Sequence, residues 1–370
     1  MSRQVSRRDA LRVGAVVGLG AVSGCSISVF GSGGPDWNLA ALSAADGSER
    51  WTTSVEGGIS EGGLALADGT VFALGDFGLW ALTVDDGSQQ WQFDPEGLVD
   101  VRAPPTVSGD DVYFAVDHWV RCLATAEGSD RWQFATDSEA AVTTTPARVG
   151  DAVVFGCENG DVYAVEAADG AERWRVETGE TVEGGPGVGD GLAVVGTNTG
   201  RVSARALADG TERWRLDTSA SGTSGISPGI TVADGVAYVS SPDGTVTAVG
   251  TAEGDTRWEF PANAFAPLRI HDGAAFGGYG VGTDMNETAD GTLTRLDLSD
   301  GRSVWSERID QDFPLGMTPA VGDDVVCCPT LNEGIHAFSL DDGSRQWQYD
   351  FGPAFVRPRM TAETVFVGTS

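Results

Sequence analysis

Lysine is absent from this chain of 370 residues, so all 23 of its basic side chains are arginine. They stand against 54 aspartate and glutamate residues, which gives a formal net charge of −31. A protein that binds nucleic acid needs a basic groove to face the phosphates. This balance of charge therefore excludes nucleic acid as a partner.

Histidine and cysteine are also scarce, with three and five residues. No Cys-x-x-Cys-His sequence and no paired Cys/His spacing occurs, which excludes an attached haem and a zinc site of the usual kind. Neither the Gly-x-Ser-x-Gly sequence of hydrolases nor a phosphate-binding loop is present. After residue 30 no apolar run has helical periodicity. We therefore expect an all-β protein with no catalytic residues and no resident metal.

An acidic composition without lysine resembles that of haloarchaeal proteins, which work in molar salt. The Debye length in such salt is about 3 Å, so the like charges of the surface are screened from one another. The acidic surface is accordingly weak support for a cationic partner.

A repeat is the main feature that the sequence does contain. Eight tryptophans end the same phrase, as in Ala41-Leu-Ser-Ala-Ala-Asp-Gly-Ser-Glu-Arg-Trp51, at spacings of 40, 41, 42, 40, 44, 47 and 42 residues. A period near 42 indicates a repeat protein. The eight are Trp51, Trp91, Trp132, Trp174, Trp214, Trp258, Trp305 and Trp347. A glycine lies four residues before each: Gly47, Gly87, Gly128, Gly170, Gly210, Gly254, Gly301 and Gly343.

Two further positions of the phrase are constrained. The residue before the glycine is Asp or Glu in all eight copies, and Ala lies ten residues before Trp in six of them. A small residue at that position leaves room for an indole to lie flat against a neighbouring backbone. Burial of eight such rings, each of roughly 150–250 Å², would join one repeat to the next. We interpret the tryptophans as structural docking residues, not as carbohydrate platforms.

One repeat encodes four strands. Residues 149–174 contain β-type runs at Val153–Gly156 and Val162–Val165, and a third begins at Arg173. Asn-Gly and Asp-Gly dipeptides separate these runs and suit tight hairpin turns. A fourth run precedes each group, often near a proline, as in Pro104-Pro105-Thr106-Val107. Four antiparallel strands per repeat predict the blade of a β-propeller.

The two ends of the chain predict that the ring closes. The first phrase begins at Asn38 without preceding blade strands, and the last strand of the chain, from Glu363, is of the kind that precedes such a phrase. We expect the C-terminal strands to complete the first blade. The result is an eight-bladed propeller of four-stranded blades without a free edge strand.

The phrase resembles the tryptophan-docking motif of quinoprotein-type propellers, the pyrroloquinoline-quinone-like (PQQ-like) repeat, over residues 38–370. It departs from the family in detail. The family's Asp at the third motif position is matched only by Asp297, and the Ala position holds Cys122 and Arg295 in two blades. The family's Thr before Gly is acidic throughout.

The resemblance implies PQQ and calcium only if the chain is an enzyme, and the site of the quinoprotein enzymes cannot be matched residue by residue. Their vicinal disulfide beside the cofactor invites comparison with Cys327-Cys328. Alignment with Val153–Gly156 puts this pair at Phe/Gly positions inside a strand, where neighbours face opposite ways. The histidines His118, His271 and His336 lie far apart in sequence. We therefore expect no cofactor.

The N-terminus has the features of an export signal. Arg7 and Arg8 precede a short apolar run, a twin-arginine pattern, and Val22-Ser23-Gly24-Cys25 resembles a lipobox. We predict a signal peptide at residues 1–24, lipidation of Cys25, a tether at 25–36 and the PQQ-like propeller at 37–370. Cleavage would remove four arginines and Asp9, leaving 19 arginines against 53 acids and a net charge of −34. The expected location is the outer face of the cell membrane.

The interval before Trp305 is the longest and contains a loop at 278–291. Asn286 lies in the only Asn-x-Ser/Thr sequon and is a candidate for glycosylation on the exported face. Asp284, Asn286 and Asp290 also offer oxygen ligands to a hard cation, although a solvated acidic loop explains them equally. We regard this loop as the best local candidate for partner contact. We interpret residues 219–228 as a longer connection between blades that has no chemistry of its own.

Three functions remain open. The first is a non-catalytic, monomeric, membrane-tethered propeller that binds other envelope or secreted proteins or assists envelope protein assembly, similar to the propeller lipoproteins of outer-membrane assembly complexes. The second is a PQQ-dependent dehydrogenase, which rests on analogy of fold. The third is a binder of small ligands that uses the central channel. We favour the first.

Overall fold

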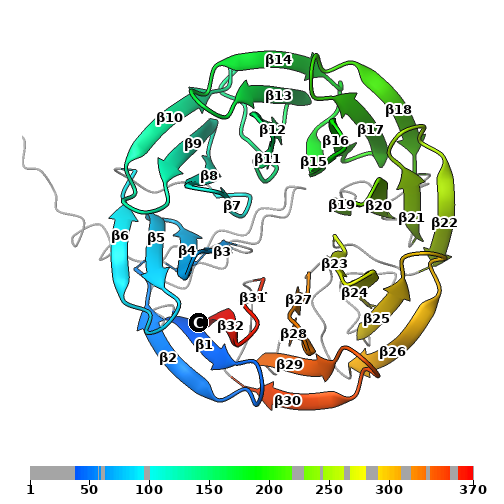
Figure 1. The fold of residues 1–370 in the computed structure, drawn as a ribbon. Coiled ribbons are helices and arrows are strands. Elements are labelled where there is room, and N and C mark those ends of the chain that lie inside the picture. The colour runs from blue at the N-terminus through cyan, green and yellow to red at the C-terminus, as the bar shows by residue number, and fades with distance from the viewer. Residues whose placement is uncertain are drawn as a thin grey trace, which may run out of the picture. The chain divides into compact units, whose positions relative to one another are not determined.

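The computed structural model describes residues 38–56, 58–59, 63–95, 101–218, 229–241, 245–261, 267–280, 291–309, 318–330, 334–350 and 357–369. They belong to one compact unit, Asp36–Ser370. Its strands form eight four-stranded antiparallel sheets, which follow one another around a ring (Figure 1). The predicted eight-bladed β-propeller is confirmed.

Each blade runs from an innermost strand to an outer strand at the rim (Figure 1). Blade 1 contains β31, β32, β1 and β2, and blades 2 to 8 take β3 to β30 in consecutive groups of four. The innermost strands of blades 1 to 8 are β31 (Arg359–Met360), β3 (Leu64–Ala67), β7 (Thr106–Ser108), β11 (Ala147–Val149), β15 (Val182–Gly189), β19 (Gly229–Ala233), β23 (Arg269–His271) and β27 (Ala320–Val321). The second strands are β32 (Thr364–Thr369), β4 (Thr70–Gly75), β8 (Asp111–Val116), β12 (Ala152–Gly156), β16 (Leu192–Thr197), β20 (Val236–Ser241), β24 (Ala274–Gly280) and β28 (Val325–Thr330).

The outer half of each blade carries the repeated phrase. The third strands are β1 (Asn38–Ser43), β5 (Gly78–Thr83), β9 (Trp119–Ala124), β13 (Asp161–Glu166), β17 (Arg201–Ala206), β21 (Thr245–Gly250), β25 (Gly291–Asp297) and β29 (Gly334–Ser339). The outer strands are β2 (Glu49–Ser54), β6 (Gln89–Phe93), β10 (Asp130–Ala135), β14 (Glu172–Glu177), β18 (Glu212–Asp217), β22 (Thr256–Pro261), β26 (Ser303–Ile309) and β30 (Arg345–Tyr349). In every blade, the pairing between the third and outer strands shifts in register next to the tryptophan.

The innermost hairpins are made by the turn residues that the sequence offers. Asp68 and Gly69 join β3 to β4, with φ of 46° and 74°. Asp234-Gly235 and Asp272-Gly273 make the same turn in blades 6 and 7. Positive φ at both central residues gives a turn whose twist matches that of the strands it connects.

Ring closure follows the predicted route. β1 pairs with β32 in antiparallel register, with Ala41 opposite Phe366 and Leu39 opposite Gly368. Blade 1 thus combines strands from both ends of the described chain. Blade 1 is joined to its two neighbouring blades in the same way as the other blades are joined to one another, so closure requires no special contact.

The apolar core lies between blades and not inside them. One buried cluster joins Tyr113 and Trp132 of blade 3 to Phe155 and Tyr163 of blade 4, and seven similar clusters occupy the other junctions. Since successive residues of a strand face opposite neighbours, both faces of each blade are apolar. This explains why the second strands read as nearly continuous apolar runs.

Candidate functional site

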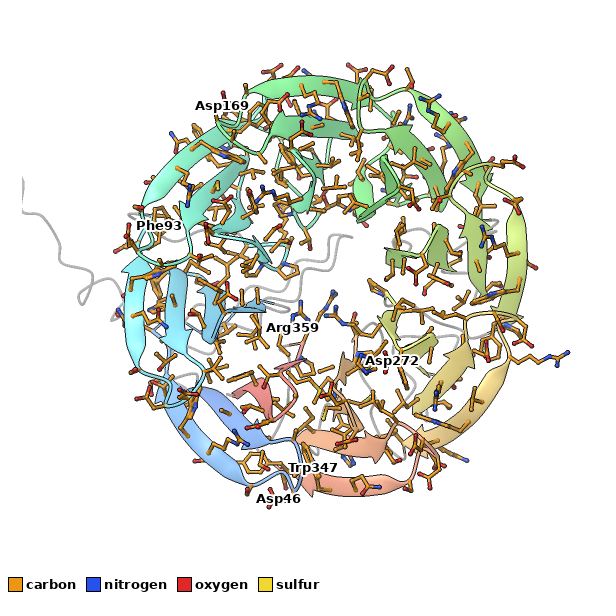
Figure 2. The ribbon with its side chains drawn as sticks, in the orientation of Figure 1. Asp46, Phe93, Asp169, Asp272, Trp347 and Arg359 are labelled. Carbon is orange, nitrogen blue, oxygen red and sulfur yellow. The ribbon has the colours of Figure 1, made fainter. Side chains whose placement is uncertain are left out.

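Every docking tryptophan bridges the seam to the next blade. Its Nε1–H donates a hydrogen bond of 2.8–2.9 Å to a carbonyl in that blade's turn between third and outer strands. In the order of the tryptophans, the carbonyls belong to Val84, Thr125, Ala167, Leu207, Thr251, Leu298, Leu340 and Ala44. The last of these closes the ring, and Figure 2 places Trp347 beside Asp46 at this junction.

The glycine of the phrase lies in the turn that receives the indole. A Cβ on Gly87 would come within 2.5 Å of the Trp51 ring, and the same clash with the preceding blade's tryptophan arises at all eight glycines. Their φ angles lie between 67° and 76°, a region that side chains disfavour. Close approach and backbone conformation together explain why glycine stands at this position.

The acidic residue before the glycine shapes the turn. The Asp86 carboxylate accepts hydrogen bonds from the Ser88 backbone N–H, at 3.0 Å, and from the Thr83 hydroxyl. The hydroxyls of Thr83 and Ser88 and that N–H lower the pKa of Asp86 to about 2. Aspartate therefore acts here as a local turn former, a role that the sequence pattern alone did not explain.

The two adjacent cysteines lie inside β28. Cys327 packs in the cluster between blades 8 and 1, whereas Cys328 packs in the cluster between blades 7 and 8. Both thiols are free and fully buried, and burial raises the pKa of each. Pairing of Cys327 with Ala337 shows that the predicted alignment was wrong by one residue, because the pair matches Val154 and Phe155 of β12. The prediction that the two cysteines lie within a strand and face opposite ways is not affected by this shift.

The histidines lie in three different places. His118 belongs to the β8–β9 turn of blade 3, where its ring centroid is 5.1 Å from that of Trp119. His271 is in β23 of blade 7, and His336 is buried in β29 of blade 8, where burial and the Arg345 charge lower its pKa to about 4. The fold does not bring the three together.

The inner wall of the ring has a register that can be followed from each tryptophan. Trp51 pairs with Ala41, Ala41 with Phe366, and Phe366 with Arg359 of the innermost strand. The same walk in blades 2 to 8 ends at Ala65, Thr106, Ala147, Gly187, Thr231, Arg269 and Ala320. Six blades therefore carry a small residue at this position, and blades 7 and 1 carry arginine.

These arginines lie near a third. Arg357 precedes β31, and its Nε has no hydrogen-bond partner among the described residues. Burial and the neighbouring Arg357 charge lower the pKa of Arg269, and burial with Arg269 and Arg357 lowers that of Arg359. Within the described part of the chain, Arg359 makes one hydrogen bond, of 3.4 Å, to the Pro358 carbonyl. Figure 2 shows Arg359 at the inner edge of the ring.

Arg357 also lines a cavity of about 300 Å³. Its lining comes from β15, β19 and the segments that lead into other innermost strands, and includes Arg102, Thr143, Glu183 and Arg357. Neither Cys327 nor Cys328 lines it, and Glu183 is the one carboxylate among the described residues of its lining. The described residues that line the cavity therefore do not match the disulfide and calcium ligands of the quinoprotein enzymes. Across the described ranges, no group of three or more His, Cys, Asp or Glu is placed to hold a metal.

Several predicted features lie outside the described residues. These are the segments 1–24 and 25–36, Cys25 and Asn286, together with most of the loop 278–291. They remain predictions. The described residues contain no helix that is long and apolar enough to cross a membrane.

Solved structures resemble this ring throughout. BamB from Moraxella catarrhalis superposes with a TM-score of 0.65 at 16% identity, over 83% of this chain and 96% of that one. A quinohemoprotein alcohol dehydrogenase from Pseudomonas putida HK5 gives 0.64 at 15% identity, over 86% and 71%. The computationally designed Ika8 protein gives 0.65 at 14% identity, over 83% and 94%. At such identities the likeness concerns the fold alone.

Among curated proteins none matches the chain. A family model does match, in two overlapping stretches that together reach from the predicted tether to the last residue. The match to the outer membrane protein assembly factor BamB family covers residues 35–175 and 158–370, and the chain belongs to this family.

Proposed function

We propose that this chain is a non-catalytic scaffold that binds other envelope or secreted proteins while a lipid anchors it to the outer face of the cell membrane. The family match over residues 35–370 is the observation that carries the proposal, because the family is described as an assembly factor. The composition resembles that of organisms without an outer membrane, so what transfers is protein binding in the envelope, not work on outer-membrane proteins.

The architecture supports such a role. The tryptophan seams join all eight blades into a closed frame, and the frame leaves the connecting loops free to differ from blade to blade. Binding residues are commonly placed on loops that a rigid scaffold positions. The loop 278–291 is the longest departure from the repeat and is the proposed contact.

Crosslinking of the tagged full chain in intact cells tests this proposal. We expect the same few exported proteins to be captured in every replicate. Replacement of residues 281–290 by a Gly/Ser segment of equal length should remove them, while the same replacement at 219–228 should not. Failure of the wild-type chain to capture any reproducible partner would argue against a scaffold.

The anchor has its own test. Cys25→Ser should leave the propeller intact and move it from the membrane fraction to the medium. Mass spectrometry of the wild-type N-terminus should show a diacylated Cys25. A variant that stays with the membrane would contradict lipid anchoring but would leave protein binding open.

A PQQ-dependent dehydrogenase is the second candidate, and the fold similarity to the quinohemoprotein alcohol dehydrogenase motivates it. The test is titration of the full chain with PQQ, with and without calcium, in molar KCl. Tryptophan fluorescence reports binding and dye reduction reports turnover. We expect no turnover, and saturable binding with dye reduction would overturn the scaffold proposal.

A further inference from the structure

Several partly buried arginines elsewhere in the ring pair with carboxylates. Arg131 and Arg148 share Asp111, at 2.8 Å and 3.1 Å, between blades 3 and 4. Arg175 bonds Asp161, whose side chain is 1% exposed, at 2.8 Å. Such pairing offsets the cost of removing a charge from water.

The inner wall departs from this pattern. Arg269 and Arg359 are partly buried, and within the described residues the charges that act on them are those of other arginines. Arginine stays protonated at neutral pH. The repulsion between these like charges therefore lowers the stability of the fold and does not neutralise either side chain.

We propose that Arg269, Arg357 and Arg359 form an anion-binding site on the inner wall of the ring, and that its ligand is a small molecule with two or more carboxylate or phosphate groups. This site is independent of the loop that we propose for protein binding. Guanidinium groups bind both kinds of anion through paired, charge-assisted hydrogen bonds.

The cavity sets the size of the ligand. Its volume of about 300 Å³ is at the small end for a ligand pocket, which admits a compact organic anion but not a folded partner. Of the three arginines, Arg357 is the one in its lining, together with Thr144 and Thr145, whose hydroxyls can donate to the same ligand. Arg102 lines it too and pairs with Glu158 at 3.0 Å. Glu183 also lines it, so the anionic groups belong at the Arg357 side.

High salt argues for more than one charge on the ligand. In molar salt a Debye length near 3 Å removes long-range attraction, so only groups in direct contact contribute to affinity. Chloride at molar concentration competes for any single guanidinium. A ligand that contacts two or three guanidinium groups at once binds more tightly than chloride, because its first contact raises the effective concentration of its other anionic groups at the site.

Calorimetry on the full chain in molar KCl tests the site, with citrate and pyrophosphate as separate probes and acetate as the control of single charge. We expect saturable heat with citrate or pyrophosphate and none with acetate. Preference for one probe identifies carboxylate or phosphate as the ligand class. Absence of saturable binding by both, or equal binding of acetate, would overturn the proposal.

Matched variants locate the binding. Arg357→Gln and Arg359→Gln should each weaken the better probe by about tenfold, the effect of losing one charged hydrogen-bonding group. Arg302→Gln is the control, because Arg302 is exposed and its partner among the described residues is the nearby Asp300. Unchanged affinity in both inner-wall variants would place the ligand elsewhere and contradict the proposal.

A chemical measurement serves if these variants fold poorly. Phenylglyoxal modifies accessible arginines, and mass spectrometry identifies the sites. The better probe should protect Arg357 and Arg359 of the wild-type chain and should leave Arg302 as reactive as before. Equal modification with and without the probe would count against the site.

Discussion

The outer rim and the inner wall of this ring follow different rules. At the rim one phrase occurs eight times, and every copy places an indole against the next blade's glycine and carbonyl. On the inner wall the equivalent position changes from alanine to threonine, glycine and arginine around the ring. Repetition marks the part that every blade needs for packing, and variation marks the part that is free to acquire a specific role.

The two regions also differ in how they treat charge. The aspartates of the rim turns accept hydrogen bonds from their own turn, and the pKa of Asp86 falls to about 2 as a result. On the inner wall, the pKa values of Arg269 and Arg359 are lowered by burial and by like charge. Rim charges therefore favour folding, whereas inner-wall charges oppose it. We expect substitutions in the two regions to change stability in opposite directions.

The largest effect should follow loss of an indole at the closing seam. Trp347→Ala removes a buried ring and its hydrogen bond to Ala44, and we expect a loss of about 3–5 kcal/mol in unfolding free energy. Trp347→Phe keeps most of the ring and should lose roughly 1–2 kcal/mol. Guanidinium unfolding in molar KCl measures both. Equal losses would show that the hydrogen bond, and not ring packing, holds the seam.

A smaller effect should follow crowding of the same seam. Gly47→Ala puts a methyl group within 2.5 Å of the Trp347 ring and should cost about 2–3 kcal/mol. Gly69→Ala is its control, since Gly69 has a similar φ of 74° but no atom within reach of a new Cβ. The control should lose about 1 kcal/mol. Similar losses for the two would mean that backbone strain alone selects the glycine.

The smallest effect should be seen in acid. The folded-state pKa of Asp86, about 2, lies below its usual value of 3.8, so its stabilisation is complete above pH 3.8 and is lost as pH falls toward 2. Asp86→Asn keeps an oxygen that can cap the turn but does not titrate. The difference in Tm between wild type and variant should shrink from pH 5 to pH 2. A difference that is constant with pH would contradict the assigned pKa.

Much of the fold could be predicted because its signals are periodic. The spacing of Trp51 to Trp347 and the Asn-Gly and Asp-Gly turns indicated eight blades, and Asn38 together with the C-terminal strand indicated the closed ring. The alignment of the strands of one repeat with those of another was less accurate where the turn signals were weaker. At Cys327 it was wrong by one residue.

The inner-wall arginines were not predicted. Arg269 and Arg359 lie 90 residues apart in innermost strands of three and two residues, which are too short to show a pattern. Only pairing across all four strands places both at one register position, between neighbours that are small. Arg357 has no equivalent in the phrase at all. A count inward from each tryptophan would have singled out blades 7 and 1.

The most direct test of this account is the thermal stability of Arg359→Gln in molar KCl without any multivalent anion. Removal of an inner-wall charge should raise Tm by about 2 °C, roughly 1 kcal/mol for a chain of this size. Arg302→Gln at the rim should leave Tm unchanged, because an exposed pair contributes little. A fall in Tm for Arg359→Gln would show that the arginine serves the fold and would contradict the division between rim and wall.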